Sequence, residues 1–168
     1  GVGLGSFQSP GPTAGKVAGA SSFLDSYSHG RALNAASLNF GTNSFSLDCW
    51  VRPAFAGPPS WQAIVDKLNV TTARGYTVGI SNNNLTLRVG DGSLYTHTGP
   101  AVNPNVWNFA GVIVDRSAST VRFYLNGVAS APQTLAATGN INNTLDLLIG
   151  APHLTNIISP TQANTDMN

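Results

Sequence analysis

Short runs of alternating apolar and polar residues recur along most of the chain. In the clearest run, 45–52, one face of a strand would be apolar and the other polar or aromatic. The apolar set is Phe45, Leu47, Cys49 and Val51, and the opposite set is Ser46, Asp48, Trp50 and Arg52. A period of two residues is typical of a strand with one buried face. Pro53 ends the run.

Further apolar runs predict strands over 62–68, 76–80, 85–89, 107–114, 121–125 and 145–149, with a short one at 93–98. Turn residues separate several of them, as in Asn82-Asn83-Asn84 and Asn126-Gly127. This spacing predicts an all-β fold, an antiparallel sandwich of two sheets. Arg31–Phe40 is the exception, because its alanines favour one or two helical turns.

The composition divides the chain into three parts. Residues 1–22 are mostly Gly, Ser, Ala and Pro and predict a flexible lead-in or arm, and residues 23–150 carry the sandwich. Residues 151–168 turn polar after Pro152 and predict a tail or arm. The 168 residues suffice for one such domain.

Charge and hydropathy exclude two classes of partner, nucleic acids and membranes. Only 9% of the residues are charged and the net charge is +1. The lysines and arginines are scattered, whereas nucleic-acid binding needs a concentrated basic stripe. No apolar run approaches the roughly 20 residues that span a membrane. Such a neutral, Asn-, Ser- and Thr-rich surface is common outside the cell and in large assemblies.

The residues with chemistry to offer do not predict an enzyme. The chain has no glutamate, and glycoside hydrolysis generally needs two carboxylates that flank the scissile bond. Asp48 and Asp66 could lie on neighbouring strands, but nothing repeats a catalytic spacing. The three histidines are far apart in sequence. The only cysteine, Cys49, is expected to be a small buried residue.

The polar face of the 45–52 strand is the best candidate for ligand binding. Asp48, Trp50 and Arg52 would place an aromatic ring beside a carboxylate and a guanidinium, an arrangement that suits a sugar. Arg88, Arg122 and Tyr124 could join this face if their strands are neighbours. Alternatively, the tryptophan only covers the sheet, and Asp48 and Arg52 form an ordinary ion pair.

Several segments, in order, resemble the laminin G-like modules of the concanavalin A-like lectin and glucanase jelly rolls. They are 37–41, 45–53, 64–67, 75–80, 85–92, 107–112, 121–128 and 147–150. The resemblance implies a jelly roll, and because the superfamily includes glucanases a relic of a glycosidase is a third alternative. Above all, the resemblance implies a recognition or adhesion module that binds glycan or protein ligands, outside the cell or on its surface.

The ends depart from the family pattern. No closing strand of the family's Ile-Asp-Glu-Val type follows Gly150, and residues 1–15 offer no clear N-terminal strand. An acidic residue of that closing strand often helps to hold calcium, so Asp25 is the best remaining candidate for a calcium ligand. An open sheet edge invites a neighbouring chain. The alternative function is therefore a structural subunit of a virion or an extracellular filament that self-assembles through its termini.

Overall fold

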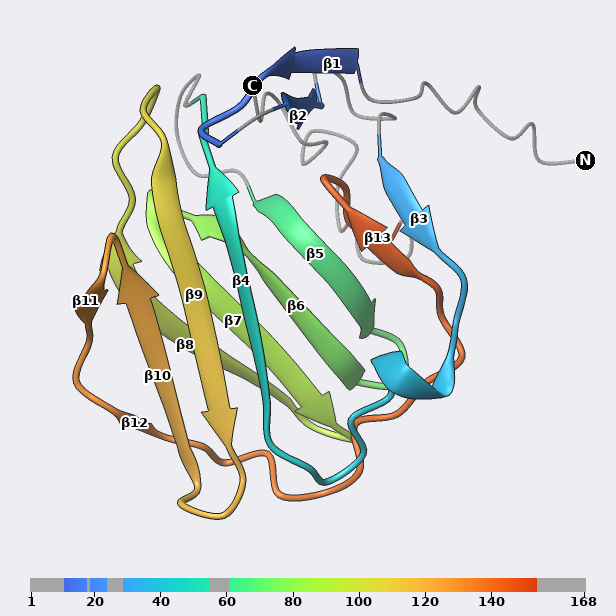
Figure 1. Cartoon of the computed structure of the whole chain (residues 1–168). Helices are drawn as coiled ribbons and strands as arrows, with labels where there is room; N and C mark the ends of the chain where they lie inside the picture. Colours follow the sequence, from blue (N-terminus) through green and yellow to red (C-terminus); the bar gives the residue numbers. More distant parts are fainter. Residues whose placement is uncertain (1–10, 18, 24–28, 55–60, 154–168) are drawn as a thin grey trace, which may run out of the picture.

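Two antiparallel sheets pack face to face and form a β-sandwich (Figure 1). The computed structural model describes residues 11–17, 19–23, 29–54 and 61–153. Within these residues the only helical element is the 3-10 turn η1, Ala36–Leu38. The predicted two-sheet sandwich is thereby confirmed.

The larger sheet has six strands in the order β3-β13-β5-β6-β7-β8. Their bounds are β3 Gly30–Ala32, β13 Leu147–Ile149, β5 Gln62–Asn69, β6 Arg74–Ser81, β7 Asn84–Asp91 and β8 Leu94–Ala101. The β6–β7 turn is the predicted one, since Asn82 and Asn83 adopt left-handed backbone at φ 48° and 63°. The strand expected at 93–98 is longer, because it continues through Ala101.

The smaller sheet has five strands, with the order β11-β10-β9-β4 and with β12 also paired to β10. Their bounds are β4 Phe45–Val51, β9 Asn108–Asp115, β10 Thr120–Leu125, β11 Val128–Ala129 and β12 Gln133–Thr134. The alternation predicted for β4 is confirmed: Phe45 and Val51 are buried, whereas Asp48 and Trp50 are exposed.

The core lies between the sheets and consists of the apolar residues that alternate along these strands. Leu85, Leu87 and Val89 of β7 face Val112, Val114, Val121 and Phe123 of β9 and β10, and each is at most 1% exposed. Residues of the opposite parity point outward. Ile113 of β9, for example, is 41% exposed.

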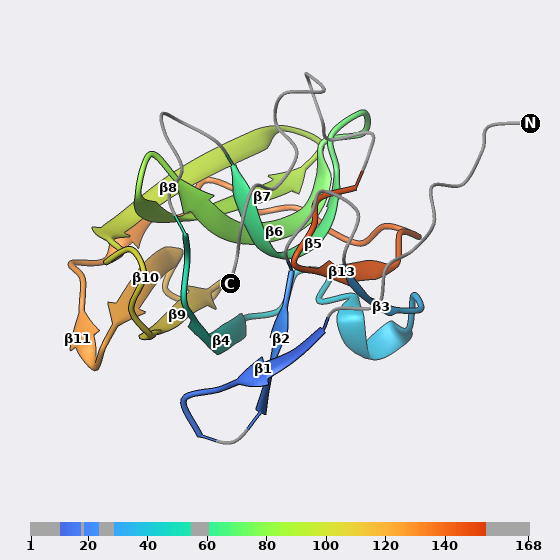
Figure 2. The same ribbon diagram turned by 90° about the horizontal axis from the view of Figure 1, so that it is seen from above.

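The N-terminal region differs from the prediction. Residues 11–22, within the expected lead-in, form a hairpin of β1, Gly11–Ala14, and β2, Gly19–Ser22. Seen from above, the hairpin projects from the sandwich beside β4 (Figure 2). After the hairpin, β3 joins the larger sheet by pairing with β13. Residues 154–168, most of the predicted tail, lie outside the described residues.

The two flanks of the sandwich are built differently. At one flank β8 and β10 meet, and the Gly99 backbone lies so close to Phe123 that an added Cβ would be 2.6 Å from the ring. Gln133 Nε2 donates to the Thr98 carbonyl over 2.7 Å and closes this flank further. At the other flank β4 is an edge strand, which among the described residues pairs only with β9.

A buried lysine ties the far end of β5 to two loops. Lys67 is 1% exposed, and its Nζ donates to Asn34 Oδ1 at 2.9 Å and the Leu145 carbonyl at 2.5 Å. It also lies 3.3 Å from the carbonyl and the Oδ1 of Asn143. Burial lowers the pKa of the Lys67 ammonium, and the charge of Asp146 raises it by a smaller amount. This lysine in the family-like run 64–67 is therefore a structural residue.

Candidate functional site

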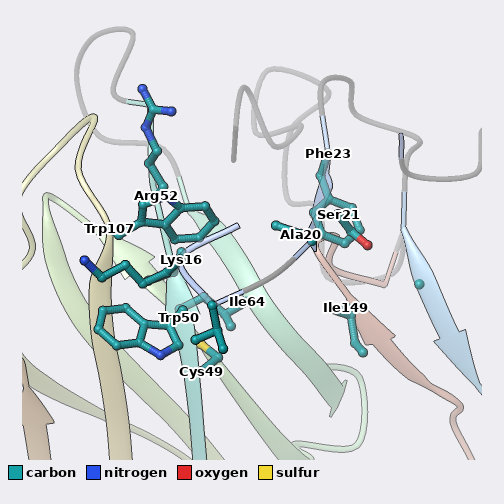
Figure 3. A pocket seen from close by; sticks show the side chains of 14 residues that line it. Lys16, Ala20, Ser21, Phe23, Cys49, Trp50, Arg52, Ile64, Trp107 and Ile149 are labelled. Atoms are coloured by element: carbon teal, nitrogen blue, oxygen red, sulfur yellow. The ribbon is translucent and has the colours of Figure 1, made fainter. Parts of the chain in front are cut away.

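A cavity of ≈ 370 Å³ opens at the β4 flank, between β4, the hairpin and β13 (Figure 3). Its lining is mainly apolar and aromatic, with Trp50 and Trp107 on the β4 side and Phe23 and Ile149 opposite. A volume of this order is typical of small-ligand pockets. The cavity is therefore the main candidate site.

Trp50 reaches the cavity because of its parity on β4. It belongs to the outward-facing set, is 41% exposed and leans on Phe109, with ring centroids 5.4 Å apart. Lys16, from the hairpin loop, places its Nζ 5.7 Å from the centroid of the Trp50 ring. This cation–π contact joins the hairpin to the smaller sheet.

Arg52 continues β4 past its last paired residue and lies at the rim beside Trp107 (Figure 3). Its Nε donates to the Asn105 carbonyl over 3.0 Å, and the Asn105 amide in turn donates to the Pro53 carbonyl over 2.8 Å. Asn105 adopts left-handed backbone at φ 60°. One nitrogen of the guanidinium is thus oriented by a loop carbonyl.

Cys49 and Ile64 lie deeper in the cavity and also line a second, smaller one of ≈ 50 Å³. This second cavity lies further along β4, between the sheets, where Leu47 and Val78 contribute. Burial, and to a smaller extent the Asp48 carboxylate, raises the pKa of the Cys49 thiol to about 11. The thiol is therefore an unreactive part of the lining.

Phe23 anchors the hairpin to the sandwich. Its side chain is 9% exposed and packs in the core, directly against Gly150. Gly150 adopts φ +83°, and a Cβ there would overlap the Phe23 ring. The glycine thus provides both the left-handed backbone and the space that the ring needs.

The structure brings most of the predicted platform together on the outer face of the smaller sheet. Asp48 pairs with Gly111, which pairs with Tyr124, and Arg122 lies one row further along β10. Asp48 and Tyr124 lie on either side of Gly111, where an added Cβ would be 3.6 Å from the Asp48 Cβ and 3.7 Å from the Tyr124 Cβ. Asp48, Trp50, Tyr124 and Arg122 therefore share one face, and Arg52 lies at its end.

Arg88 does not belong to this face. It lies on β7 in the other sheet, where its Cζ is 4.2 Å from the centroid of the Trp61 ring. Burial lowers the pKa of the guanidinium, and Asp66 raises it by a smaller amount. The sequence places Arg88 on an outward face but does not say of which sheet.

The two aspartates considered as a catalytic pair are separated as well. Asp48 is on β4, and Asp66 is on β5 in the other sheet, fully buried. Asp66 accepts the backbone amides of Leu68 and His153, over 3.1 and 2.6 Å. Asp25, the calcium candidate, lies outside the described residues, and among those described no three His, Cys or Asp side chains cluster as a metal site.

Among the cavity residues that were not found from the sequence are Lys16 and Trp107. Lys16 lies in the Gly- and Pro-rich segment that composition assigned to a lead-in, and Trp107 was assigned to the strand expected at 107–114. The signal for Trp107 was the loop sequence Asn103-Pro104-Asn105 just before it, since β9 begins only at Asn108.

Comparison with known proteins gives the fold a wider context. No curated protein sequence matches the chain. The binding domain of a paraclostridial mosquitocidal protein has a similar structure, with TM-score 0.72 and 15% identity over 85% of this chain and 38% of that one. The botulinum neurotoxin serotype G binding domain has TM-score 0.66 and 16% identity, over 88% and 40% of the two chains.

A botulinum neurotoxin type C structure is also similar, at TM-score 0.58 and 16% identity, and covers 82% of this chain but only 32% of that one. The chain thus spans two fifths or less of the lengths of these three proteins. In the described part, no helix is long and apolar enough to cross a membrane.

A family model provides the assignment. The model described as the concanavalin A-like lectin/glucanases superfamily matches residues 25–163, most of the chain. The match includes all strands from β3 to β13 and excludes the β1–β2 hairpin. This confirms the resemblance found in the segments from 37 to 150: the chain belongs to the concanavalin A-like lectin/glucanases superfamily.

Proposed function

We propose that the chain is a non-catalytic recognition module that binds glycan ligands outside the cell, through the outer face of β4 around Trp50. The observation that carries the proposal is an exposed indole with polar neighbours on a rigid sheet. Trp50 is 41% exposed, Asp48 precedes it and Arg52 follows it on the outward side of β4, and Tyr124 lies on the same face of the sheet two strands away.

The chemistry of this face suits a pyranose ring. The indole of Trp50 offers a flat apolar surface on which the C–H face of a sugar can stack. Asp48 accepts hydrogen bonds from sugar hydroxyls, and Arg52 and Tyr124 donate to them.

Relatives of similar fold add support for glycan or protein ligands. Cell entry of the botulinum neurotoxin type C depends on two ganglioside molecules, and the binding domain of neurotoxin DC was solved in complex with rat synaptotagmin II. The binding domain of neurotoxin DC was also solved with a sialylated ligand named SialylT. All three are much longer than this chain, and the likeness extends to fold.

A glycan array followed by titration of the retained sugars tests the proposal. Trp50→Ala should weaken binding about threefold to tenfold, the range expected for one stacking interaction, and Trp50→Phe should restore part of it. Val128→Ala, at an exposed position on β11, is the control. Equal binding by the wild type and Trp50→Ala would show that the face is not the site.

The free edge of β4 supports a second candidate function, a structural subunit of a virion or an extracellular filament. Seven residues of β4, Phe45–Val51, present an edge that no described residue pairs. Such an edge can accept a strand of a neighbouring subunit, for example from a terminal arm. The mass in solution separates the two functions: a subunit should form oligomers as concentration rises, and a monomer at all concentrations rejects this candidate.

A further inference from the structure

The flank cavity combines an apolar interior with positive charge at its rim. Lys16 and Arg52 stand at the β4 side, and Trp50 and Trp107 lie beneath them (Figure 3). None of the described residues that line this cavity is acidic. The lining therefore has two distinct parts, a cationic rim and an apolar body.

Neither cation is neutralised by the described part of the protein. Lys16 makes a cation–π contact with the Trp50 ring, and Arg52 donates a hydrogen bond to the Asn105 carbonyl. The Arg31–Asp146 ion pair lies elsewhere. Asp48 lines only the smaller cavity. A negatively charged group at the rim would meet a cation, Arg52 at one side or Lys16 at the other, and would compete with no carboxylate of the lining.

The interior beyond the rim offers little to a polar ligand. Its walls are Val51, Ile64, Phe23 and Ile149, and the smaller cavity beyond Cys49 continues with Leu47 and Val78. Sugar hydroxyls placed here would lose their water without gaining hydrogen-bond partners. An alkyl chain or an apolar ring would gain from the same burial.

We propose that this cavity binds a small amphipathic anion, a free organic carboxylate or sulfate whose apolar body lies between the sheets. The anionic group meets Arg52 at the rim. The body passes between Trp50 and the hairpin toward Cys49 and Ile64. The site is separate from the proposed glycan face, although Trp50 borders both, so either can exist without the other.

Calorimetric titration of the whole chain with three probes tests the proposal. Octanoate carries both the charge and the apolar chain, octanamide keeps the chain without the charge, and acetate keeps the charge without the chain. We expect octanoate to bind measurably, octanamide about fivefold more weakly, in line with a partly exposed ionic contact, and acetate not at all. Equal binding of octanamide and octanoate would overturn the anion selectivity, and no octanoate binding would overturn the site.

Two pairs of variants locate the bound octanoate. Arg52→Gln should weaken octanoate binding about fivefold, whereas Arg74→Gln, which removes an arginine outside the lining, should not. Ala20→Phe should abolish binding, because the Ala20 side chain points into the cavity from the hairpin (Figure 3). Ala129→Phe, on the exposed strand β11, adds the same bulk elsewhere. Denaturant unfolding of each variant confirms that the fold is retained.

Cys49 provides an independent readout, since it is the only cysteine and lies in the cavity. Octanoate should slow its reaction with a thiol reagent, and octanamide should do so less at equal concentration. Unchanged labelling at saturating octanoate would mean that the ligand binds elsewhere. Binding to vesicles of phosphatidylglycerol without binding of free octanoate would also reject the proposal, in favour of a membrane surface.

The same samples separate this site from the glycan face. Tyr124→Ala removes a side chain of the outer face that does not line the cavity, so it should lower sugar binding and leave octanoate binding intact. If the chain binds octanoate but no sugar of the glycan array, the proposed glycan-binding function is rejected and the present inference stands. Glycan binding without octanoate binding would reject only the present inference.

Discussion

The two flanks of the sandwich differ in how closely they are packed. At the β8–β10 flank, glycine backbone lies directly on an aromatic ring, and a glutamine side chain bridges the strands. At the β4 flank the sheets are bridged by a hairpin of small residues above an open cavity. Closely packed side chains tolerate few substitutions without loss of stability. A cavity at a sheet edge forfeits van der Waals contacts but leaves space for a ligand.

The largest expected effect comes from the closed flank. Phe123→Ala removes a fully buried ring that packs on Gly99 and should lower the free energy of unfolding by about 3–5 kcal/mol. Trp50→Ala, at the open flank, should cost less than about 1 kcal/mol because the side chain is 41% exposed. Urea unfolding of both variants measures the difference, and similar losses would remove the distinction between the flanks.

A smaller effect is expected where the hairpin is anchored. Gly150→Ala should cost about 1–3 kcal/mol, because the new methyl collides with Phe23 in addition to the strain at φ +83°. Gly127→Ala is the matched control, since Gly127 has φ +84° but nothing within 4 Å. Displacement of Phe23 should also speed trypsin cleavage after Lys16. If both alanine variants behave alike, Phe23 does not hold the hairpin.

The closed flank should also respond to acid. His97 on β8 is 7% exposed, and among the described residues its Nε2 has no hydrogen-bond partner. Burial lowers the pKa of the imidazole, an effect that the Gln133 hydrogen bond only partly opposes. Because the unfolded state then binds the proton more readily, stability should fall as pH drops below about 6.5.

Comparison with His97→Gln isolates this contribution from that of the carboxylates. The wild type should lose more stability than the variant between about pH 7.5 and about pH 5.5, by denaturant unfolding. If the wild type and His97→Gln lose equal stability, groups other than His97 cause the acid sensitivity.

The last prediction for the open flank concerns the reactivity of Cys49 and involves no change in stability. The raised pKa of about 11 leaves almost no Cys49 thiolate at neutral pH. Labelling in the native state should therefore be about a hundredfold slower than in urea-unfolded protein. Labelling rates within a few fold of each other would show that the hairpin opens often and exposes the thiol.

Local patterns predicted the sandwich well, and pairing between distant strands explains most of what they missed. Alternation over 45–52 placed Trp50 and Cys49 on the correct faces, and Asn82-Asn83 and Asn126-Gly127 form the expected turns. Alternation cannot tell which sheet a strand joins, so Arg88 and Asp66 were grouped with residues of the other sheet.

The cavity depends on a segment whose composition suggested no structure. Lys16 reaches Trp50 only because β1 and β2 pair with each other and Phe23 fixes their base on Gly150. Glycine raises the conformational freedom of a segment and proline interrupts regular elements, but neither reveals a single aromatic anchor at the end of the segment. The contribution of Trp107 was likewise hidden, because its partners come from distant segments.

Lys67 has a consequence for the conditions that the domain tolerates. Where loops of sandwich proteins converge with their oxygen atoms inward, a bound ion can neutralise them, and such a junction then depends on the ion's concentration. Here oxygen atoms of Asn34, Asn143 and Leu145 converge on an ammonium group that is covalently part of β5. This junction cannot be lost by dilution or by a chelator, whatever the ionic composition of the surroundings.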